Sequence, residues 1–508
     1  MTPLLAVGNP NRLWFGPRVF DDAPLCPAKA AVALRNYEPP TGITSEPLAK
    51  FSGGSWLAAA NLLRELADRG PTSAYANARH PVTDLYRLAA SILPHEAQPV
   101  REFAVMAVDA VLDAQASTGP HAFDLYPTFV KMPFWSGEMH AGGAFFFQGS
   151  AGAWQVWRLR ITKARPAGEA TRNWAVTAAY CLSGHLDHEH LKPLRVVEAF
   201  EIGAAGGPVE RLGTWTRTDL HAEFDALCQG CLRDMASDLR VRPGPHCSDC
   251  RFAGICPAVP RTVGLLEFVP RQPAIRKISA TDLRTHADCA RRYQLLSLHG
   301  LPGEPLTGEA LLRGQLLDAW LQANHRRGVA CTDDDVQRFL GETDDLAGTA
   351  MARQHLGICP LADPATSGLT VQTEAVALDA YSRIMLVCRP DAVYIRDAEV
   401  VWRETKTRTT LTRCSTQQLI EADVTAALYL TVLASGASGT PDALEWEELS
   451  SDGQELTILP ADDPELLDIA RTHVSAAVAD LISDEAYTAR PGVRCASCAA
   501  KRWCAEAP

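Results

Sequence analysis

The stretch Cys388–Thr410, CRPDAVYIRDAEVVWRETKTRTT, joins two strand-like patterns to a compact set of charged residues. Its Val, Ile and Tyr content and its partial alternation predict two strands that form a hairpin. Glu404 and Lys406 are two positions apart, so their side chains point to one face of the second strand. Asp391 comes 13 residues before Glu404, on the first strand. The pattern therefore places two carboxylates and a lysine at one edge of a sheet.

This group of residues suits the hydrolysis of a phosphate ester. Asp391 and Glu404 can together hold a hard divalent ion such as Mg²⁺ or Mn²⁺. Such an ion lowers the pKa of a bound water and polarises a phosphate oxygen. Lys406, beside the ion, can orient that water and offset the charge of a pentacovalent transition state.

Two cysteine triplets share the spacing C-x2-C-x5-C, and each follows an Arg-Pro-Gly. A lone cysteine lies far upstream of each triplet, at the start of a helix-like segment. Cysteines that cluster in a reducing compartment are more often metal ligands than disulfides. We therefore expect one four-thiolate metal centre in each half of the chain: Cys26, Cys247, Cys250 and Cys256 in the first half, and Cys289, Cys495, Cys498 and Cys504 in the second.

The bulk composition describes a globular protein with a full core. The chain has 508 residues, of which 47% are hydrophobic and 21% charged. No apolar run approaches the ~18–20 residues that span a bilayer, and the first residues lack the pattern of a signal peptide. We therefore expect a cytoplasmic protein without a membrane partner. The net charge of −12 argues against loose attraction of the whole surface to nucleic acid, but it permits a locally basic groove near Arg284 and Arg408.

The order of motifs repeats along the chain, which predicts a tandem duplication. We expect one domain over residues 1–260, a linker over 261–276 and a second domain over 277–508. The second opens with a capping box, Ser279-Ala-Thr-Asp282, that predicts a helix carrying Cys289. When Lys163 is aligned with Lys406, Ile161 falls at the position of Glu404, and Asp391 has no counterpart. The first domain is therefore expected to be inactive.

The second half resembles a known family. RPD391 followed by E404-T-K406 resembles the PD-(D/E)XK nuclease motif. Together with the cysteine frame, residues 277–508 resemble the iron–sulphur nucleases of the RecB/AddB type and the CRISPR-adaptation exonucleases. The resemblance implies an α/β fold of two tandem restriction-endonuclease-like domains, each with a mixed sheet flanked by helices. It also implies a Mg²⁺- or Mn²⁺-dependent deoxyribonuclease that works beside a helicase or another DNA-processing partner, in DNA repair or in defence against foreign DNA.

The resemblance also assigns roles to single residues. It implies a structural [4Fe–4S] cluster on each cysteine set, which staples the end of the domain to its first helix. Asp318 stands where the family has a metal-binding histidine, and it can still bind a hard ion. Thr425 stands where the family has a glutamine, four residues before Tyr429. Tyr429 and Arg408 are candidates for positioning the substrate.

Several alternatives remain. Cys228-x2-Cys231-x15-Cys247-x2-Cys250 is close to a zinc spacing, and zinc can replace iron in either set. The protein can also be an inactive DNA-binding or scaffold subunit, which the departures at Asp318 and Thr425 favour. Glu374 is interpreted as an exposed strand residue. The remaining cysteines are interpreted as small buried hydrophobic residues, namely Cys181, Cys331, Cys359, Cys388 and Cys414.

Overall fold

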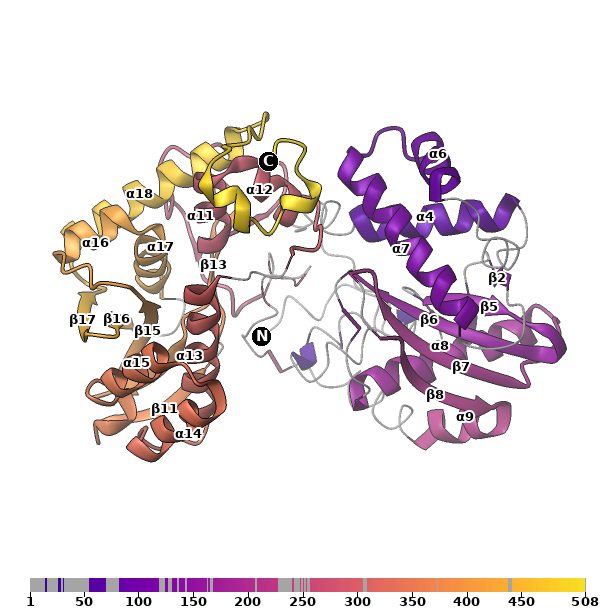
Figure 1. Ribbon diagram of the computed structural model, residues 1–508, viewed down its shortest axis with the longest axis horizontal. Helices are drawn as coiled ribbons and strands as arrows, with labels where there is room; N and C mark the ends of the chain where they lie inside the picture. The colour runs from indigo at the N-terminus through magenta and orange to yellow at the C-terminus, as the bar shows by residue number, and fades with distance from the viewer. Residues whose placement is uncertain are drawn as a thin grey trace. The chain divides into compact units, whose positions relative to one another are not determined.

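The structure is a computed structural model, and the chain divides into two compact units. The first centres on Ala49–Arg242, and the second on Pro243–Gln294 and Glu304–Pro508. We describe each by itself (Figure 1). The structure describes residues 14–15, 26–28, 31, 54–69, 82–117, 124–126, 130–134, 137–141, 144–161, 163–164, 168–205, 208–226, 240–241, 247, 250, 253, 256–304, 308–371, 373–436 and 441–507.

The second unit is built on a five-stranded mixed sheet in the order β11-β14-β15-β16-β17. All neighbours are antiparallel except β15 and β16, which run parallel. A parallel pair needs a crossover connection, which two helices, α16 (Thr416–Ala422) and α17 (Val424–Leu433), provide. The strands are β11 (Thr366–Val371), β14 (Ala392–Arg396), β15 (Glu399–Thr407), β16 (Pro441–Ser450) and β17 (Gly453–Pro460).

Helices cover this sheet on both faces. Figure 1 shows α16, α17 and α18 (Pro464–Ser483) on one side of β15–β17. The other side carries α13 (Glu309–His325), α14 (Asp333–Thr343) and α15 (Leu346–Leu356). α17 is buried along its whole length, as its run of apolar residues requires. A separate apolar core around Trp320 and Phe339 joins α13–α15 to Leu449 of β16.

A smaller sheet in the second unit has the order β10-β13-β12-β9. Its strands are β9 (Arg261–Thr262), β10 (Arg276–Ser279), β12 (Ala375–Asp379) and β13 (Ile384–Cys388). Residues 261–276, the expected linker, thus contribute β9, and Val269 and Ile275 among them are buried. The first cysteine triplet packs against the apolar residues of this sheet.

The helix predicted after Ser279 is present but broken. Ser279 Oγ accepts a hydrogen bond from the Asp282 amide (3.2 Å), and the Asp282 carboxylate accepts one from the Ser279 amide (2.9 Å), which confirms the capping box. The helix ends at Cys289, whose backbone is extended. Cys289 therefore separates α11 (Ala280–Asp288) from α12 (Ala290–Tyr293), which continues as a π-helical turn, η4 (Gln294–Leu298).

The first unit repeats the strand arrangement of the second. Its larger sheet has the order β2-β5-β6-β7-β8, again with one parallel pair, β6 and β7. The crossover is a single helix, α8 (Glu169–His188). The strands are β2 (Asp124–Tyr126), β5 (Ala144–Gln148), β6 (Ala153–Arg160), β7 (Val196–Gly203) and β8 (Glu210–Thr216).

The smaller sheets of the two units also correspond. In the first, β1 (Trp14–Phe15) runs parallel to β4 (Gly137–His140), which pairs antiparallel with β3 (Lys131–Phe134). In the second, β10, β13 and β12 pair in the same senses. Among the described residues of the first unit, the helices with given bounds are α4 (Gly54–Arg69), α6 (Val82–Ile92), α7 (Gln98–Ser117), α8 and α9 (Arg217–Phe224). In the described part of the chain, no helix has the length and apolar character needed to cross a bilayer.

Candidate active site and metal centres

The β14–β15 hairpin brings Asp391 and Glu404 together. The Asp391 carboxylate accepts a hydrogen bond of 2.7 Å from the Thr405 amide, next to Glu404 in the chain. Burial raises the pKa of the Asp391 carboxyl well above its usual range, and the nearby charge of Glu404 raises it further. The two predicted carboxylates therefore share one buried site.

The Glu404 side chain is only half satisfied. Its Oε1 atom pairs with Lys406 Nζ, which also lies 5.3 Å from the centre of the Trp446 ring. Its Oε2 atom is buried and has no hydrogen-bond partner among the described residues. Burial raises the pKa of Glu404, although the charge of Lys406 opposes the shift. Burying a carboxylate oxygen without a hydrogen-bond partner costs free energy. A cation bound to this oxygen would remove that cost.

Asp318 lies within electrostatic reach of the site. It is an exposed residue of α13, hydrogen-bonded to Gln322 (2.9 and 3.0 Å), and its charge contributes to the raised pKa of Asp391. One turn earlier, a Cβ on Gly314 would lie 3.1 Å from Thr407 Oγ1. The glycine thus allows α13 to pass close to the end of β15, which brings Asp318 toward the carboxylates.

The two residues predicted to position substrate have structural partners. Tyr429 is buried, and its hydroxyl accepts a hydrogen bond from the Arg389 amide (3.2 Å), two residues before Asp391. Burial raises the pKa of Tyr429, and the charge of Glu404 raises it further. Arg408 pairs with Glu448 (3.2 Å) and, more weakly, with Asp423 (3.9 Å).

Two further side chains differ from the family pattern or from expectation. Thr425 is buried, and its hydroxyl has no hydrogen-bond partner among the described residues. Glu374 was expected to be exposed, and this was wrong. Glu374 is buried because β12, the strand that follows it, lies in the core. The Glu374 carboxylate pairs with Arg389 (2.9 Å).

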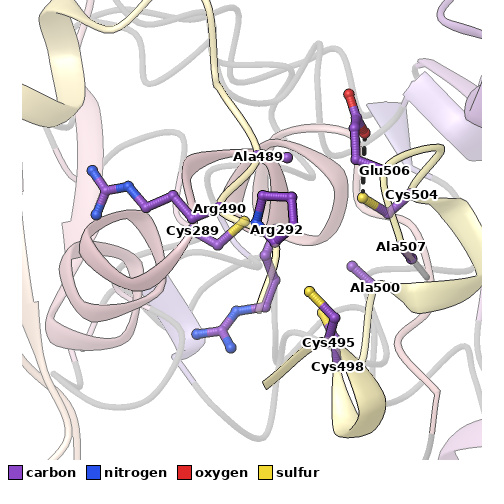
Figure 2. Close-up of a pocket in the computed structure, with 11 residues that line it drawn as sticks. Cys289, Arg292, Ala489, Arg490, Cys495, Cys498, Ala500, Cys504, Glu506 and Ala507 are labelled. Carbon is purple, nitrogen blue, oxygen red and sulfur yellow. Dashed lines mark hydrogen bonds between the residues drawn. The ribbon is translucent and has the colours of Figure 1, made fainter. Parts of the chain in front are cut away.

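The four cysteines of the second set line one pocket. Cys289 enters it from the break between α11 and α12, and the other three come from the C-terminal segment, around the short 3-10 turns η6 (Val493–Ser497) and η7 (Lys501–Trp503). Figure 2 shows Cys289 on one side of this pocket, with Cys495 and Cys498 on another and Cys504 on a third. The Cys504 thiol donates to Glu506 (3.4 Å).

The two triplets have the same backbone hydrogen bonds. The amide of Cys250 donates to the carbonyl of Cys247, and the amide of Cys498 donates to that of Cys495, each at 3.2 Å. Three more bonds follow at matching positions, of 3.0, 3.3 and 3.2 Å in both triplets. Cys26 belongs to the first unit and the first triplet to the second, so the first four-cysteine set stays a prediction. Cys228 and Cys231, of the zinc alternative, lie outside the described residues.

A further group of metal-binding side chains lies between the helices of the second unit. One ligand atom from each of His325, Cys331, His355 and Cys359 lies within 4.8 Å of the others, and all four residues are buried. Cys331 and Cys359 are buried in the apolar core around Trp320, as expected, and they also belong to a group that could bind a metal. The sequence carries a signal that was missed, namely the pairs H-x5-C and H-x3-C.

The strand registers locate the position of Glu404 in the first unit. Ala144 pairs with Arg158 as Ala392 pairs with Arg403. The same two arginines pair with Glu201 and Glu445 on the next strand. If the two sheets are aligned by these registers, Arg158, rather than Arg160, matches Arg403, which differs by two residues from the alignment of Lys163 with Lys406. In that alignment Leu159 falls at the position of Glu404.

Comparison with known proteins identifies the fold family of the second half. Residues 277–505 match the PD-(D/E)XK nuclease superfamily, which confirms the resemblance over that range. The RecB/AddB-like subtype and the tandem duplication stay predictions. A search of the curated proteins found no match. A solved structure described as "Crystal structure of SSO0001" matches 46% of this chain and 87% of its own, with 14% identity and a TM-score of 0.22.

Proposed function

We propose that this protein, whose residues 277–505 form a domain of the PD-(D/E)XK nuclease superfamily, is a Mg²⁺- or Mn²⁺-dependent deoxyribonuclease. Its active site would consist of Asp391, Glu404 and Lys406. The observation that carries the proposal is the buried, unpartnered Oε2 atom of Glu404 in the same site as Asp391. Two adjacent carboxylates, the buried Glu404 and the half-buried Asp391, disfavour each other's ionisation, and a divalent cation between them reverses that preference.

The carboxylates fit a hard divalent ion. Asp391 and Glu404 would hold it, and Asp318 would add an oxygen ligand, directly or through water. When bound, the ion supplies a water of lowered pKa and positive charge near the scissile phosphate.

The remaining residues hold this arrangement in place. The Thr405 amide fixes one oxygen of Asp391, and Lys406 fixes one oxygen of Glu404. The ammonium group of Lys406 also offers positive charge to a phosphate that approaches Glu404. Arg284 is exposed on α11, and its charge lowers the pKa of Glu404, so a second cation lies within electrostatic reach of the site. Such a cation favours contact with a DNA backbone.

The second cysteine set would hold a [4Fe–4S] cluster with a structural role. Cys289 lies at the start of the domain and Cys504 near its end, so the cluster would link two segments distant in sequence.

The first unit would be a non-catalytic copy. Leu159 stands at the position of Glu404, and the residue before Ala144, at the position of Asp391, is a glycine in the sequence (Gly143). A site without carboxylates cannot hold the ion. Such a copy would contact DNA or a partner such as a helicase, in DNA repair or in defence against foreign DNA; this last step rests on analogy with the family.

The activity is tested with end-labelled single- and double-stranded DNA, Mg²⁺ or Mn²⁺, and protein purified without oxygen. Glu404→Gln should abolish cleavage. Glu399→Gln makes the same chemical change at an exposed position of the same strand, and it should leave cleavage unchanged. Mn²⁺ binding, followed by electron paramagnetic resonance, should weaken in Glu404→Gln alone. If wild type binds no Mn²⁺ and cleaves nothing, the enzyme proposal fails and the inactive DNA-binding or scaffold subunit remains.

The cluster is tested by metal analysis of the anaerobic protein. The second set should contribute about four irons per chain, and Cys504→Ser should lose them and lower the melting temperature. Cys414→Ser is the control, because Cys414 is a half-buried thiol outside every predicted set. An iron content that Cys504→Ser does not change would contradict the assignment.

A further inference from the structure

The four ligands of the buried His/Cys group are carried by the ends of helices. His325 is the last residue of α13, and Cys331 follows in the loop before α14. His355 lies in the last turn of α15, and Cys359 precedes the short 3-10 turn η5 (Pro360–Ala362). Each pair therefore contains one helical histidine and one loop cysteine, and the two pairs meet between the helices.

The separations between these atoms fit a tetrahedral zinc site. With Zn–N bonds of about 2.0–2.1 Å and Zn–S bonds of about 2.3 Å, tetrahedral angles separate two nitrogens by about 3.3 Å, and a nitrogen from a sulphur by about 3.6 Å. The Nε2 atoms of His325 and His355 are 3.2 Å apart. Cys359 Sγ lies 3.8 Å from His325 Nε2. The group therefore has nearly the dimensions of a zinc coordination shell.

A carboxylate orients one of the imidazoles. His355 Nδ1 lies 2.6 Å from Glu447 Oε1, and both side chains are fully buried. A hydrogen bond between these two atoms takes its proton from Nδ1, because a carboxylate oxygen accepts, and the Nε2 atom of His355 then faces that of His325. A carboxylate on the outer nitrogen of a histidine is the usual support for a metal ligand.

We propose that His325, Cys331, His355 and Cys359 bind one structural Zn²⁺ ion. Two imidazoles and two thiolates form a borderline-soft donor set, and a tetrahedral S₂N₂ site selects zinc over Mg²⁺ or Mn²⁺. The set is closed, because all four positions come from the protein. This ion is separate from the iron–sulphur and catalytic ions, and it does not depend on the proposed nuclease function.

The site links the helices to the catalytic strand. Arg403 of β15 donates to the carbonyl of Ile358 (2.6 Å), the residue before Cys359, and it also pairs with Glu447 (3.4 Å). Thr405 donates to the same carboxylate (3.2 Å). Side chains alternate along a strand, so Arg403 and Thr405 support the zinc site from one face of β15 while Glu404 and Lys406 lie on the other. Zinc would thus brace the strand that carries the active site.

Metal content of the full chain tests the proposal. Wild type purified without chelators should contain zinc, and Cys359→Ala should contain one zinc fewer per chain. Cys359→His should restore the lost ion, because histidine is itself a zinc ligand. Cys388→Ala is the control: Cys388 is a fully buried cysteine of the same unit outside the group, and its loss should leave the zinc content unchanged. Equal zinc in Cys359→Ala and wild type would overturn the proposal.

X-ray absorption at the zinc edge of the wild-type protein keeps the test decisive if Cys359→Ala does not fold. Imidazole nitrogen together with sulphur in the zinc shell would support the proposal, because the other two cysteine sets contain no histidine. A shell of sulphur alone, or the absence of zinc, would overturn it.

Discussion

The amide of Thr405 donates a 2.7 Å hydrogen bond to the Asp391 carboxylate. This bond ties the start of β14 to the position between Glu404 and Lys406. The carboxylates are thus held together before any ion binds, although burial raises the pKa of both. Pre-organisation of like charges stores unfavourable energy at a functional site.

Removing one of these charges should therefore lower the activity without lowering the stability of the fold. Asp391→Asn retains an oxygen that accepts from Thr405, but it removes the negative charge. We expect cleavage to fall by about 10²-fold or more, while the free energy of unfolding stays constant or rises by about 0.5–2 kcal/mol. Chemical denaturation and cleavage assays on the same samples measure both. A destabilised Asp391→Asn would show that the carboxylate serves the fold instead.

A second prediction concerns the buried arginine behind the active site. Arg403 pairs with Glu445 and Glu447, and its side chain is 3% exposed. Arg403→Met should leave these buried carboxylates undercompensated, at a cost of about 3–5 kcal/mol. Arg396→Met removes a more exposed partner of Glu445 and should cost less, about 1–3 kcal/mol, because one buried oxygen of Glu445 loses its ion-pair partner while Arg403 stays. Urea denaturation measures both, and equal effects would contradict the importance of the buried network.

The hairpin that carries the candidate active site could be predicted from sequence because its information is local. Alternation places Glu404 and Lys406 on one face, and the RPD and ExK spacing fits two adjacent strands. The alignment of Lys163 with Lys406 is less certain from sequence, because short similar strings match in more than one register. The strand pairing of Arg158 with Glu201, like that of Arg403 with Glu445, favours a register shifted by two residues.

The His/Cys group could not be predicted from the sequence alone. His325 and Cys331 are separated from His355 and Cys359 by two helices, and the packing of those helices decides whether the pairs meet. Taken alone, each cysteine in the sequence is typical of a small buried apolar residue. A search for paired His and Cys at helix ends would have raised the group as a candidate.

A third prediction concerns pH and the C-terminal tail. The Asp484 carboxylate accepts from the amides of Tyr487 (2.9 Å) and Ala486 (3.0 Å) and contacts His286 (2.9 Å). These bonds, that from Tyr487 foremost, lower the pKa of Asp484 below its ordinary 3.8. A group with a lowered folded-state pKa stabilises above its ordinary pKa, and this contribution is lost as pH falls through the folded value.

The stability difference between wild type and Asp484→Asn should therefore be largest above pH 3.8 and shrink in stronger acid. Thermal unfolding across this range measures it. Asp480 is an exposed carboxylate of α18, the helix that ends just before Asp484, and Asp480→Asn should show a smaller dependence. A difference that grows in acid would have the wrong sign and would exclude the proposed role of Asp484.

The fourth prediction concerns the close approach of α13 to β15. A Cβ on Gly314 would lie 3.1 Å from Thr407 Oγ1, whereas one on Gly341 of α14 would meet nothing within 4 Å. Gly341→Ala should therefore stabilise by about 0.4–1 kcal/mol, the usual gain of alanine at a compatible site. Gly314→Ala should lose this gain, because Thr407 or α13 must give way by a few tenths of an ångström, and cleavage should fall to the extent that α13 moves and Asp318 moves with it.

Thr407→Ala makes this prediction specific. It removes the hydroxyl that the new methyl group would meet, so Gly314→Ala should recover the ordinary gain when Thr407→Ala is present. A double-mutant cycle on unfolding free energy measures the coupling, which we expect to exceed about 0.5 kcal/mol. Additive effects would mean that the glycine is not required by the contact with β15. The distance of Asp318 from the carboxylates would then have to be set by another contact of α13.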